Sequence, residues 1–200
     1  MFKIILKITE MAQNYVKQVL RDRDVAVDAT LGNGNDTIFL SGLVPEGRVY
    51  SFEIQRECVK KFKKEIEIKG IRNIEVINDG HENMDLYIKE SPKAIMFNLG
   101  YLPGGYKNVI TRPETTIAAL KKGLKMLSPG GIITIAVYRG HEGGEEEGNA
   151  VLDFINGLDP KIYNAMVIKY VNRKGMAPFL IVIEKNCSVG GDKYNNPDLL

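Results

Sequence analysis

The sequence predicts an α/β protein built on a doubly wound, Rossmann-like sheet of about seven strands, and three observations lead to this fold class. Residues 25–40 combine a short apolar run, a turn with two glycines and an apolar helical pattern, which indicates a strand, a turn and a helix. Apolar strand-like runs then alternate with helical patterns along the chain, as in parallel sheets. The last two strand-like runs follow each other directly, which indicates an antiparallel hairpin.

Length and composition fit one globular domain. The chain has 200 residues, of which 44% are hydrophobic and 26% charged, and its formal net charge is +2. We therefore expect a single domain over residues 1–185 and a polar tail without periodicity over residues 186–200. Because the net charge is small, any surface for nucleic acid has to be a local patch.

Cysteine usage and hydropathy lead us to expect a cytoplasmic protein. Cys58 and Cys187 are too few and too far apart to suggest a structural disulfide. Lys7 and Glu10 interrupt the N-terminal apolar run, which is therefore unlike a signal peptide. No run reaches the roughly 18 apolar residues that a membrane span requires, so no contact with a membrane is expected.

Helices and strands can be placed in order along the first half of the chain. A leading helix is expected over residues 9–20, where apolar residues recur at helical spacing and Thr9 can act as the cap. A second helix is expected to open at Asp36 and to end at Gly42, and a third covers residues 55–69. Strands are expected at residues 25–27, 48–53, 73–77 and 93–98.

The second half continues this alternation and then departs from it. A helix over residues 113–127 has Pro113 in its first turn, and a helix over residues 145–158 follows the most hydrophobic strand. The strands of this half are expected at residues 132–137, 163–170 and 179–183. The last two strands should form an antiparallel hairpin on an otherwise parallel sheet, whose crossovers should be right-handed.

The glycine turn after the first strand indicates which ligand the sheet holds. Gly32 and Gly34 let the backbone pass close to a ligand, just before a helix whose first N–H groups are free. A dinucleotide-binding turn needs a third glycine, at the position that Thr37 occupies. Asp28 and Asp36 would repel a pyrophosphate, whereas they suit a cationic sulfonium and its amino group.

The carboxyl ends of the other strands support this interpretation. Glu53 ends the second strand about 20 residues beyond the glycines, where a carboxylate can accept both ribose hydroxyls, so that S-adenosylmethionine is the expected cofactor. Ligands of open α/β sheets lie at the carboxyl ends of the strands, so the polar residues there are the site candidates. They are Asp28, Glu53, Asp79-Gly80-His81, Asn98-Leu99-Gly100-Tyr101 and Tyr138-Arg139-Gly140-His141.

The segment from Asn98 to Tyr101 resembles a variant of the Asn-Pro-Pro-Tyr loop of methyltransferases that act on exocyclic amines. An amide oxygen and a backbone carbonyl can hold the hydrogens of an amine so that its lone pair meets the methyl group, while Tyr101 stacks on a base. Leu99 and Gly100 stand where that loop has two prolines. The alternative is that Asn98 only ties the end of the strand to its loop.

Histidines and arginines add further candidates at this edge. His81 is expected to hydrogen-bond the cofactor, and His141 to orient the substrate or accept a proton, although either histidine can instead be structural. Arg112 and Arg139 are candidates for phosphate contacts. The two histidines and two cysteines lack ligand spacing, so no metal site is expected. Acidic residues that we expect to enrich a helix N-terminus, rather than to form a cation site, are Glu142, Glu145, Glu146 and Glu147.

Several long motifs resemble the YtqB-like rRNA methylase family of class I methyltransferases, which includes the MnmM-type enzymes. These motifs are residues 28–37, 52–55, 80–82, 97–104, 115–116 and 137–144. The resemblance covers about residues 9–185. It implies a methyltransferase that uses S-adenosylmethionine to methylate the aminomethyl group of a modified wobble uridine, with the anticodon region of tRNA as its partner.

The resemblance also implies roles for individual residues. It places Asn33, Asn35, Asp36, Glu53, Gln55 and His81 in the cofactor site. The turn and the strand ends add Asp28, Gly32, Gly34, Thr37, Asp79, Gly80 and Asn98. The expected catalytic residues are Asn98, Tyr101 and His141. The expected substrate-binding residues are Leu99, Gly100, Tyr101, Leu102, Pro103, Gly104, Arg112, Tyr138, Arg139 and His141. We expect aspartate in the family where this chain has Glu53, and the longer carboxylate can still reach a ribose.

The expected reaction is direct in-line transfer of a methyl group to a neutral amine, which desolvation favours, without a covalent enzyme intermediate. Three alternatives stay open at this point: methylation of ribosomal RNA, methylation of a small molecule, and a cofactor-binding module without activity. The exposed edge of the final hairpin could also pair with a second copy to form a homodimer.

Overall fold

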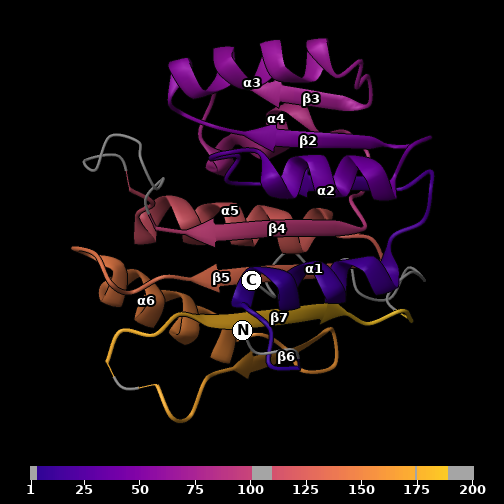
Figure 1. Ribbon diagram of the computed structural model, residues 1–200. Coiled ribbons are helices and arrows are strands. Elements are labelled where there is room, and N and C mark those ends of the chain that lie inside the picture. The colour runs from indigo at the N-terminus through magenta and orange to yellow at the C-terminus, as the bar shows by residue number, and fades with distance from the viewer. Residues whose placement is uncertain (1–3, 101–109, 174, 189–200) are drawn as a thin grey trace.

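The strands lie side by side in one sheet (Figure 1). The computed structural model describes residues 4–100, 110–173 and 175–188. Within these residues seven strands follow the order β3-β2-β1-β4-β5-β7-β6. The strands are β1 (Val25–Asp28), β2 (Arg48–Phe52), β3 (Ile74–Ile77), β4 (Ala94–Leu99), β5 (Ile132–Val137), β6 (Tyr163–Ile168) and β7 (Phe179–Lys185). The first five are parallel, and β7 runs antiparallel to both of its neighbours, β5 and β6. The predicted fold class is therefore confirmed.

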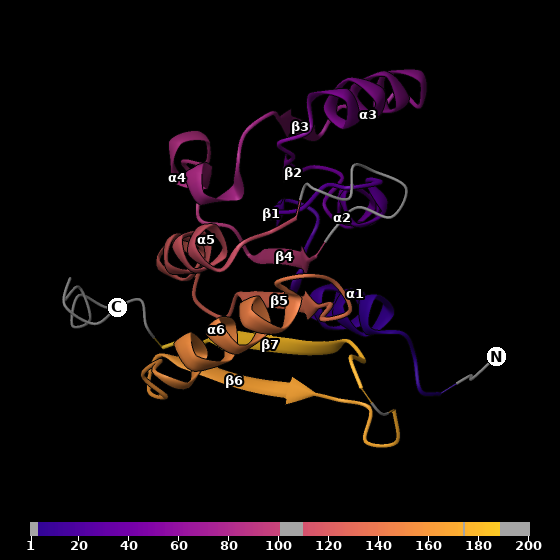
Figure 2. The same cartoon turned by 90° about the vertical axis from the view of Figure 1, so that its left-hand side faces the viewer.

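Helices cover both faces of this sheet (Figure 2). On one face lie α1 (Ile8–Val19), α2 (Asn35–Leu43) and α3 (Arg56–Ile68). On the other face lie α4 (Met84–Tyr87), α5 (Pro113–Met126) and α6 (Gly144–Asn156), and a 3-10 turn η1 (His81–Asn83) precedes α4. This distribution makes the sheet doubly wound, as the alternation of strands and helices predicts.

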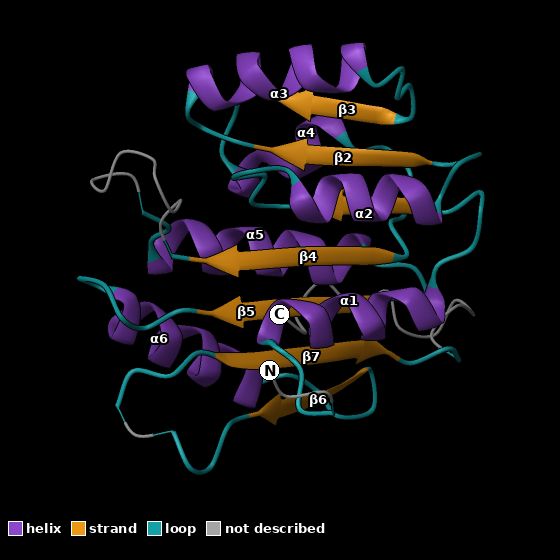
Figure 3. Ribbon diagram, in the orientation of Figure 1, coloured by secondary structure: helices purple, strands orange, loops and turns teal. Residues whose placement is uncertain are grey.

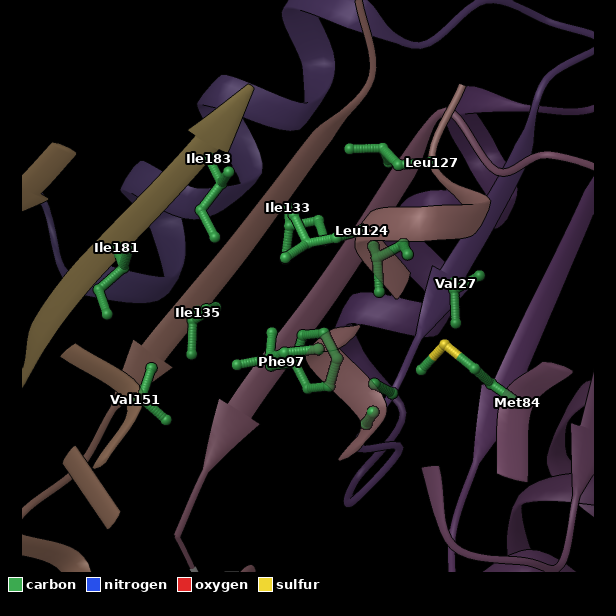
Figure 4. Packing of buried hydrophobic residues seen from close by; sticks show 14 of the residues in the cluster. Val27, Met84, Phe97, Leu124, Leu127, Ile133, Ile135, Val151, Ile181 and Ile183 are labelled. Atoms are coloured by element: carbon green, nitrogen blue, oxygen red, sulfur yellow. The ribbon is translucent and has the colours of Figure 1, made fainter. Parts of the chain in front are cut away.

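Alternate residues of the central strands supply two separate hydrophobic cores. Val27 and Phe97 point to the face where Leu124 of α5 and Val151 of α6 lie, and all four are buried (Figure 4). Their strand neighbours Ala26 and Met96 belong to the cluster that packs under α1 and α2. Because side chains alternate along a strand, a strand buried on both faces reads as a continuous apolar run. The cores thus hold β1, β4 and β5 in the middle of the molecule.

Most helix boundaries agree with the sequence predictions to within two residues, but one detail was wrong. The N-cap of α1 is Lys7, and its backbone N–H donates to Glu10 Oε2 at 3.1 Å, so Thr9 is not the cap. Helix α2 ends at Leu43, one residue beyond the expected Gly42. The turn η1 and the single-turn α4 were not predicted, since one helical turn is too short to show a period.

The final hairpin brings β6 to one edge of the sheet. β7 is inserted between β5 and β6, and the middle of β6 is exposed to solvent. This confirms the antiparallel hairpin. Most of the expected polar tail, residues 189–200, lies outside the described part of the chain. Among the described residues, no helix combines the length and the apolar character needed to cross a membrane.

Candidate active site

The carboxyl ends of the parallel strands all face one edge of the sheet (Figure 3). The residues that follow these strands border a cavity. The cavity has a volume of about 900 Å3. It is lined by the segments that follow β1, β2, β3, β4 and β5, by one face of α1 and by the beginning of α5. Predicted site residues that line it are Gly32, Asn33, Asn35, Asp36, Glu53, Gln55, Asp79, Gly80, His81, Asn98, Leu99, Gly100, Arg112 and Tyr138.

Other predicted site residues are placed elsewhere. Residues that do not line the cavity are Asp28, Gly34, Thr37, Arg139 and His141. Tyr101, Leu102, Pro103 and Gly104 lie outside the described residues.

Gly34 is needed for packing next to the cavity. It is the N-cap of α2 and has a φ of +76°, which side-chain-bearing residues rarely adopt. A Cβ atom on Gly34 would lie 2.0 Å from Cε2 of Phe62 on α3. The second glycine of the turn therefore lets α3 pack against the turn. Gly32, with a φ of +52°, forms the part of the turn that reaches the cavity.

Asp28 is fully buried beneath the turn and fixes its geometry. Its carboxylate accepts a hydrogen bond from Thr37 Oγ1 at 2.6 Å and another from the backbone N–H of Thr30 at 3.1 Å. Burial raises the pKa of Asp28 to about 7, and the nearby charge of Asp36 adds to this effect. Asp28 thus joins the end of β1 to the beginning of α2, and its carboxylate is not positioned for a direct contact with a ligand in the cavity.

Asp36 and Asn98 form the central polar contact of the cavity. Asn98 Nδ2 donates to Asp36 Oδ2 at 2.7 Å, and Gln13 Nε2 of α1 donates to Asp36 Oδ1, also at 2.7 Å. A carboxylate only accepts hydrogen bonds, so the amide nitrogen of Asn98 must be the atom that faces Asp36. The backbone N–H of Asn98 donates to Thr30 Oγ1 at 2.8 Å. Asn98 is thereby oriented with its Oδ1 left as the acceptor.

Glu53 is held between the end of β2 and the glycine turn. Its Oε2 accepts the N–H of Gly32 at 3.2 Å, and its Oε1 accepts the N–H of Gln55 at 2.9 Å. Each carboxylate oxygen can accept a further hydrogen bond. Two backbone donors thus fix a carboxylate that can still bind a pair of neighbouring hydroxyl groups.

His81 and Asp79 present acceptors after β3. His81 Nδ1 lies 3.1 Å from the carbonyl oxygen of Ala29, so Nδ1 carries the hydrogen of the neutral ring. Burial lowers the pKa of His81 below its usual value, which keeps the ring neutral and makes Nε2 an acceptor at neutral pH. Tyr87 O–H and Asn83 Nδ2 donate to Asp79 at 2.7 and 2.9 Å, and these hydrogen bonds lower the pKa of its carboxyl. Asp79 is therefore charged.

A second set of contacts fixes the backbone at Gly100. Its N–H donates to Thr111 Oγ1 at 2.9 Å, and its carbonyl accepts the N–H of Thr111 at 3.1 Å. Thr111 Oγ1 in turn donates to Glu147 Oε2 at 2.6 Å, and Thr116 Oγ1 donates to Glu147 Oε1 at the same distance. Glu147 lies in the first turn of α6, as predicted, but it is only 1% exposed and also serves as a buried acceptor for the two threonines, which the sequence did not indicate. We call Glu147, Thr111 and Gly100 the Glu147 clamp.

Tyr138 and Arg112 line the cavity, whereas Arg139 and His141 do not. The Arg139 guanidinium lies 5.6 Å from the ring centroid of Phe179, and its Nη2 donates to the carbonyl of Gly175 at 3.4 Å. The His141 ring packs behind Gly100, where a Cβ atom on Gly100 would lie 3.5 Å from His141 Cε1. A substrate contact of either side chain would therefore lie outside the described cavity wall.

Sequence reasoning missed several polar residues of the wall. Thr9 and Gln13 of α1 and Thr111 and Thr115 near the start of α5 all line the cavity. Thr9 and Gln13 lie four residues apart, each directly after a residue of the buried apolar face of α1, so a polar pair beside that face was the available signal. In the described residues no group of three or more histidine, cysteine, aspartate or glutamate side chains gathers as it would around a metal ion.

Comparisons with known proteins find methyltransferases among the similar sequences. A family model described as "Putative rRNA methylase" matches residues 49–184. The chain is 36% identical over 191 residues to the chloroplastic tRNA (mnm(5)s(2)U34)-methyltransferase of Arabidopsis thaliana, and the match covers 90% of this chain and 69% of that protein.

Solved structures with similar sequences share the fold over nearly their whole length. A crystal structure described as a "putative rRNA-methylase" from Clostridium thermocellum superimposes with a TM-score of 0.88 at 42% identity, over 92% of this chain and 100% of that one. A "putative methyltransferase" from Streptococcus mutans, solved in complex with SAH, gives a TM-score of 0.84 at 41% identity, over 91% and 99% of the two chains.

Proposed function

The chain belongs to the rRNA methylase family, and on this premise we propose that it methylates the aminomethyl group of a 5-aminomethyluridine, with or without a 2-thio group, at the wobble position of tRNA. It is an S-adenosylmethionine-dependent methyltransferase that acts on RNA. The proposal concerns the nucleoside, the roles of individual residues and the anticodon region as partner. We assign the activity to one domain, residues 1–185, and place it in the cytoplasm.

The cavity fits S-adenosylmethionine by the chemistry of its wall. Among the described residues that line it, Arg112 is the only lysine or arginine, whereas carboxylates come from Asp36, Glu53, Asp79 and Glu82. Such a wall disfavours a pyrophosphate and suits a sulfonium cation with an amino group. When bound, the cofactor supplies an electrophilic methyl group. We assign its ribose hydroxyls to Glu53, its adenine amino group to Asp79, and its methionine part to the turn with Gly32, Asn33 and Asn35.

The orientation of Asn98 is the observation that carries the proposed reaction. Asp36 holds Nδ2, so that Oδ1 can accept an N–H of the substrate amine at the carboxyl end of β4. With one N–H held there, the nitrogen lone pair can be directed at the methyl group. The nitrogen would take up the methyl group that the bound cofactor supplies, and the proton that the amine then gives up would pass to solvent water. Removal of the amine from water on entry into the cavity would lower its pKa and favour its neutral, reactive form.

Ribosomal RNA is the second candidate substrate, because the description of the matching family favours it. The relative from Arabidopsis thaliana carries the name of a wobble uridine methyltransferase, which favours tRNA. The described wall of the cavity does not distinguish the two RNAs, because it can contact only the nucleotide that enters the cavity and not the surrounding RNA.

One experiment separates these substrates. Labelled S-adenosylmethionine is incubated with the protein and with tRNA or ribosomal RNA from cells that lack this methyltransferase, and the nucleosides are analysed by mass spectrometry. We expect label in tRNA, with conversion of the aminomethyl wobble uridine to its methylaminomethyl form. Label confined to ribosomal RNA would replace the proposed substrate, and the absence of label from both RNAs would refute the proposal.

We also include a homodimer in the proposal. The edge strand β6 exposes Met166 and Val167, at 43% and 41% of their surface, next to unpaired backbone groups. A second copy that pairs at this edge would cover both side chains. Light scattering of the purified protein would give twice the mass of the chain if this pairing occurs.

A further inference from the structure

The loop between β6 and β7 lies at the same edge of the sheet as the cavity (Figure 1). β6 runs antiparallel to β7, and β7 runs antiparallel to β5, so β6 ends at the edge where β5 ends. Phe179, the first residue of β7, pairs with Val137, the last residue of β5. Tyr138 follows Val137 and lines the cavity. The loop is therefore only one strand away from the cavity wall.

Three cations gather around this loop, and none of them has a carboxylate partner among the described residues. Lys169 Nζ and the Arg139 guanidinium lie 5.2 and 5.6 Å from the ring centroid of Phe179. The Arg173 guanidinium lies 3.7 Å from the ring centroid of Tyr170. We call Arg139, Lys169 and Arg173 the β6–β7 cationic surface. Ion pairs that the structure describes on other surfaces join Arg23 to Glu46, Arg48 to Glu75, Lys60 to Glu57, Lys69 to Glu65 and Lys122 to Asp85, and none involves these three cations.

Aromatic rings hold these cations in place. Tyr170 is itself anchored, because its O–H donates to the backbone carbonyl of Leu6 in the segment before α1. Phe179 is buried, so the ring that Arg139 and Lys169 contact is fixed in the core. A cation that rests on an aromatic ring keeps its N–H groups available for another partner. The surface is therefore positively charged, ordered before binding and open to an anion.

A substrate RNA must carry its backbone across the rim of this cavity. The nucleotides on either side of a base that enters the cavity bear one negative charge each, and most contacts of a protein with a nucleic acid go to such phosphates. The exposed glutamates Glu142, Glu145 and Glu146 at the beginning of α6 repel phosphate. The path of the backbone that electrostatics favours thus avoids these glutamates and crosses the β6–β7 loop.

We propose that the β6–β7 cationic surface binds the phosphate backbone of the RNA substrate next to the methylated nucleotide. This inference rests on the proposed function, because it takes RNA as the substrate of the cavity. Arg173 and Lys169 bind phosphate directly, and Arg139 links their loop to the segment that carries Tyr138. The surface adds affinity for RNA without contributing to the chemistry of transfer.

The test compares two double variants with the same change of charge. Lys169→Gln/Arg173→Gln alters the proposed surface, and Lys125→Gln/Lys161→Gln alters exposed lysines at the opposite edge, near the end of α5 and before β6. Affinity for unmodified tRNA is measured at several salt concentrations, together with kcat and KM for methylation. Binding of SAH and thermal unfolding are measured as controls of folding.

We expect the first variant to lose about 25-fold in tRNA affinity at 0.1 M salt, because two single-strand phosphate contacts each contribute about 0.7 to the salt slope. Its salt slope should fall by about 1.4, its KM should rise, and its kcat and SAH affinity should stay unchanged. The second variant should behave like the wild type. The inference is overturned if the wild type methylates tRNA while both double variants keep its KM and salt slope.

Two further results separate this inference from the proposed function. If the wild type binds tRNA through this surface but methylates no RNA, the proposed function fails and the surface remains. If the first variant loses binding to vesicles of anionic lipid and keeps its affinity for tRNA, the surface serves a membrane and the inference is wrong.

Discussion

Asn98 gains its orientation from a neighbour that can only accept hydrogen bonds. Because Asp36 engages the amide nitrogen at 2.7 Å, the amide cannot flip without placing its oxygen against a carboxylate. The same carboxylate is held by Gln13 from α1, a helix far from β4 in the sequence. The acceptor for the amine is therefore set before the substrate arrives, which lowers the cost of ordering it.

Replacing Asn98 with alanine should remove this acceptor. We expect kcat to fall about 100-fold, since a misplaced reacting group costs about that factor, while the affinity for SAH changes little. Single-turnover methylation of tRNA and calorimetry with SAH measure the two effects. Asn149→Ala, on the exposed face of α6, is the matched control and should keep full activity. An unchanged kcat in Asn98→Ala would leave Asn98 with only the structural role of tying β4 to its loop.

Glu147 acts through the clamp and does not line the cavity. In Glu147→Gln the amide nitrogen replaces one carboxylate oxygen, so Thr111 or Thr116 loses its acceptor inside the protein. We expect a loss of about 1–3 kcal/mol in unfolding free energy and a lower kcat/KM for tRNA, with unchanged SAH affinity. Urea unfolding and steady-state kinetics check this. Glu146→Gln, one residue away and exposed, should have neither effect. Equal behaviour of the two variants would contradict the clamp.

Asp28 makes stability depend on pH in an unusual direction. Its pKa is about 7 in the folded protein, against 3.8 ordinarily, so between these values the folded state holds a proton that the unfolded state has released. Its contribution to the unfolding free energy is therefore present below pH 4 and is lost as the pH rises through 7. In Asp28→Asn this loss is absent, so the variant should gain stability relative to the wild type between pH 4 and 7. Urea unfolding across this range measures the difference, which would stay constant if Asp28 were ionised throughout.

At the scale of elements, the turn between β1 and α2 depends on one glycine more than on the other glycine nearby. Gly34 combines a left-handed backbone with contact to Phe62 of α3, whereas Gly42, inside α2, has nothing within 4 Å of the position that a Cβ atom would take. One glycine thus joins three elements, and the other only lowers helix propensity.

Alanine at these two positions should have opposite effects. Gly34→Ala forces a side chain into a left-handed conformation and against Phe62, which we expect to cost about 2–5 kcal/mol. Gly42→Ala should stabilise the protein by about 0.5–1 kcal/mol. Chemical unfolding measures both. Gly34→Ala should cost less unfolding free energy in the Phe62→Ala background than in the wild type, because the ring that it would contact is gone. An equal cost in both backgrounds would show that the steric contact does not matter.

The sequence allowed the elements to be predicted better than the contacts between them. Apolar periodicity placed the long helices and all strands, and the polar residue after each strand correctly indicated the wall of the cavity at Glu53, His81 and Asn98. Burial is a property of the folded chain, so the sequence could not show that Asp28 lies under the turn or that Glu147 is enclosed. The outward turn of Arg139 likewise depends on Phe179, which comes next to it only through the order of β5 and β7.

At the scale of the whole molecule, the two ends of the chain complete the site together. Helix α1 supplies Thr9 and Gln13 to the cavity wall, and it packs in one apolar cluster with Leu180 and Val182 of β7. Tyr170, near the end of the described chain, donates its hydroxyl hydrogen to Leu6 near the beginning. The wall itself is built from segments between Thr9 and Tyr138, and the hydrogen bond between Tyr170 and Leu6, 164 positions apart, joins the segment before α1 to the segment after β6 outside the wall.

The packing of α1 against β7 affects how the protein folds during synthesis on the ribosome. The chain emerges from its N-terminus, so α1, the glycine turn and β4 leave the exit tunnel before β7 has been made. Until Phe179–Lys185 has emerged, β5 lacks its outer neighbour and α1 lacks part of the apolar surface that it covers. A nascent chain thus carries all the cofactor-facing residues described above before the sheet that supports them is complete, and we expect the growing polypeptide to bind its cofactor only after β7 has been made.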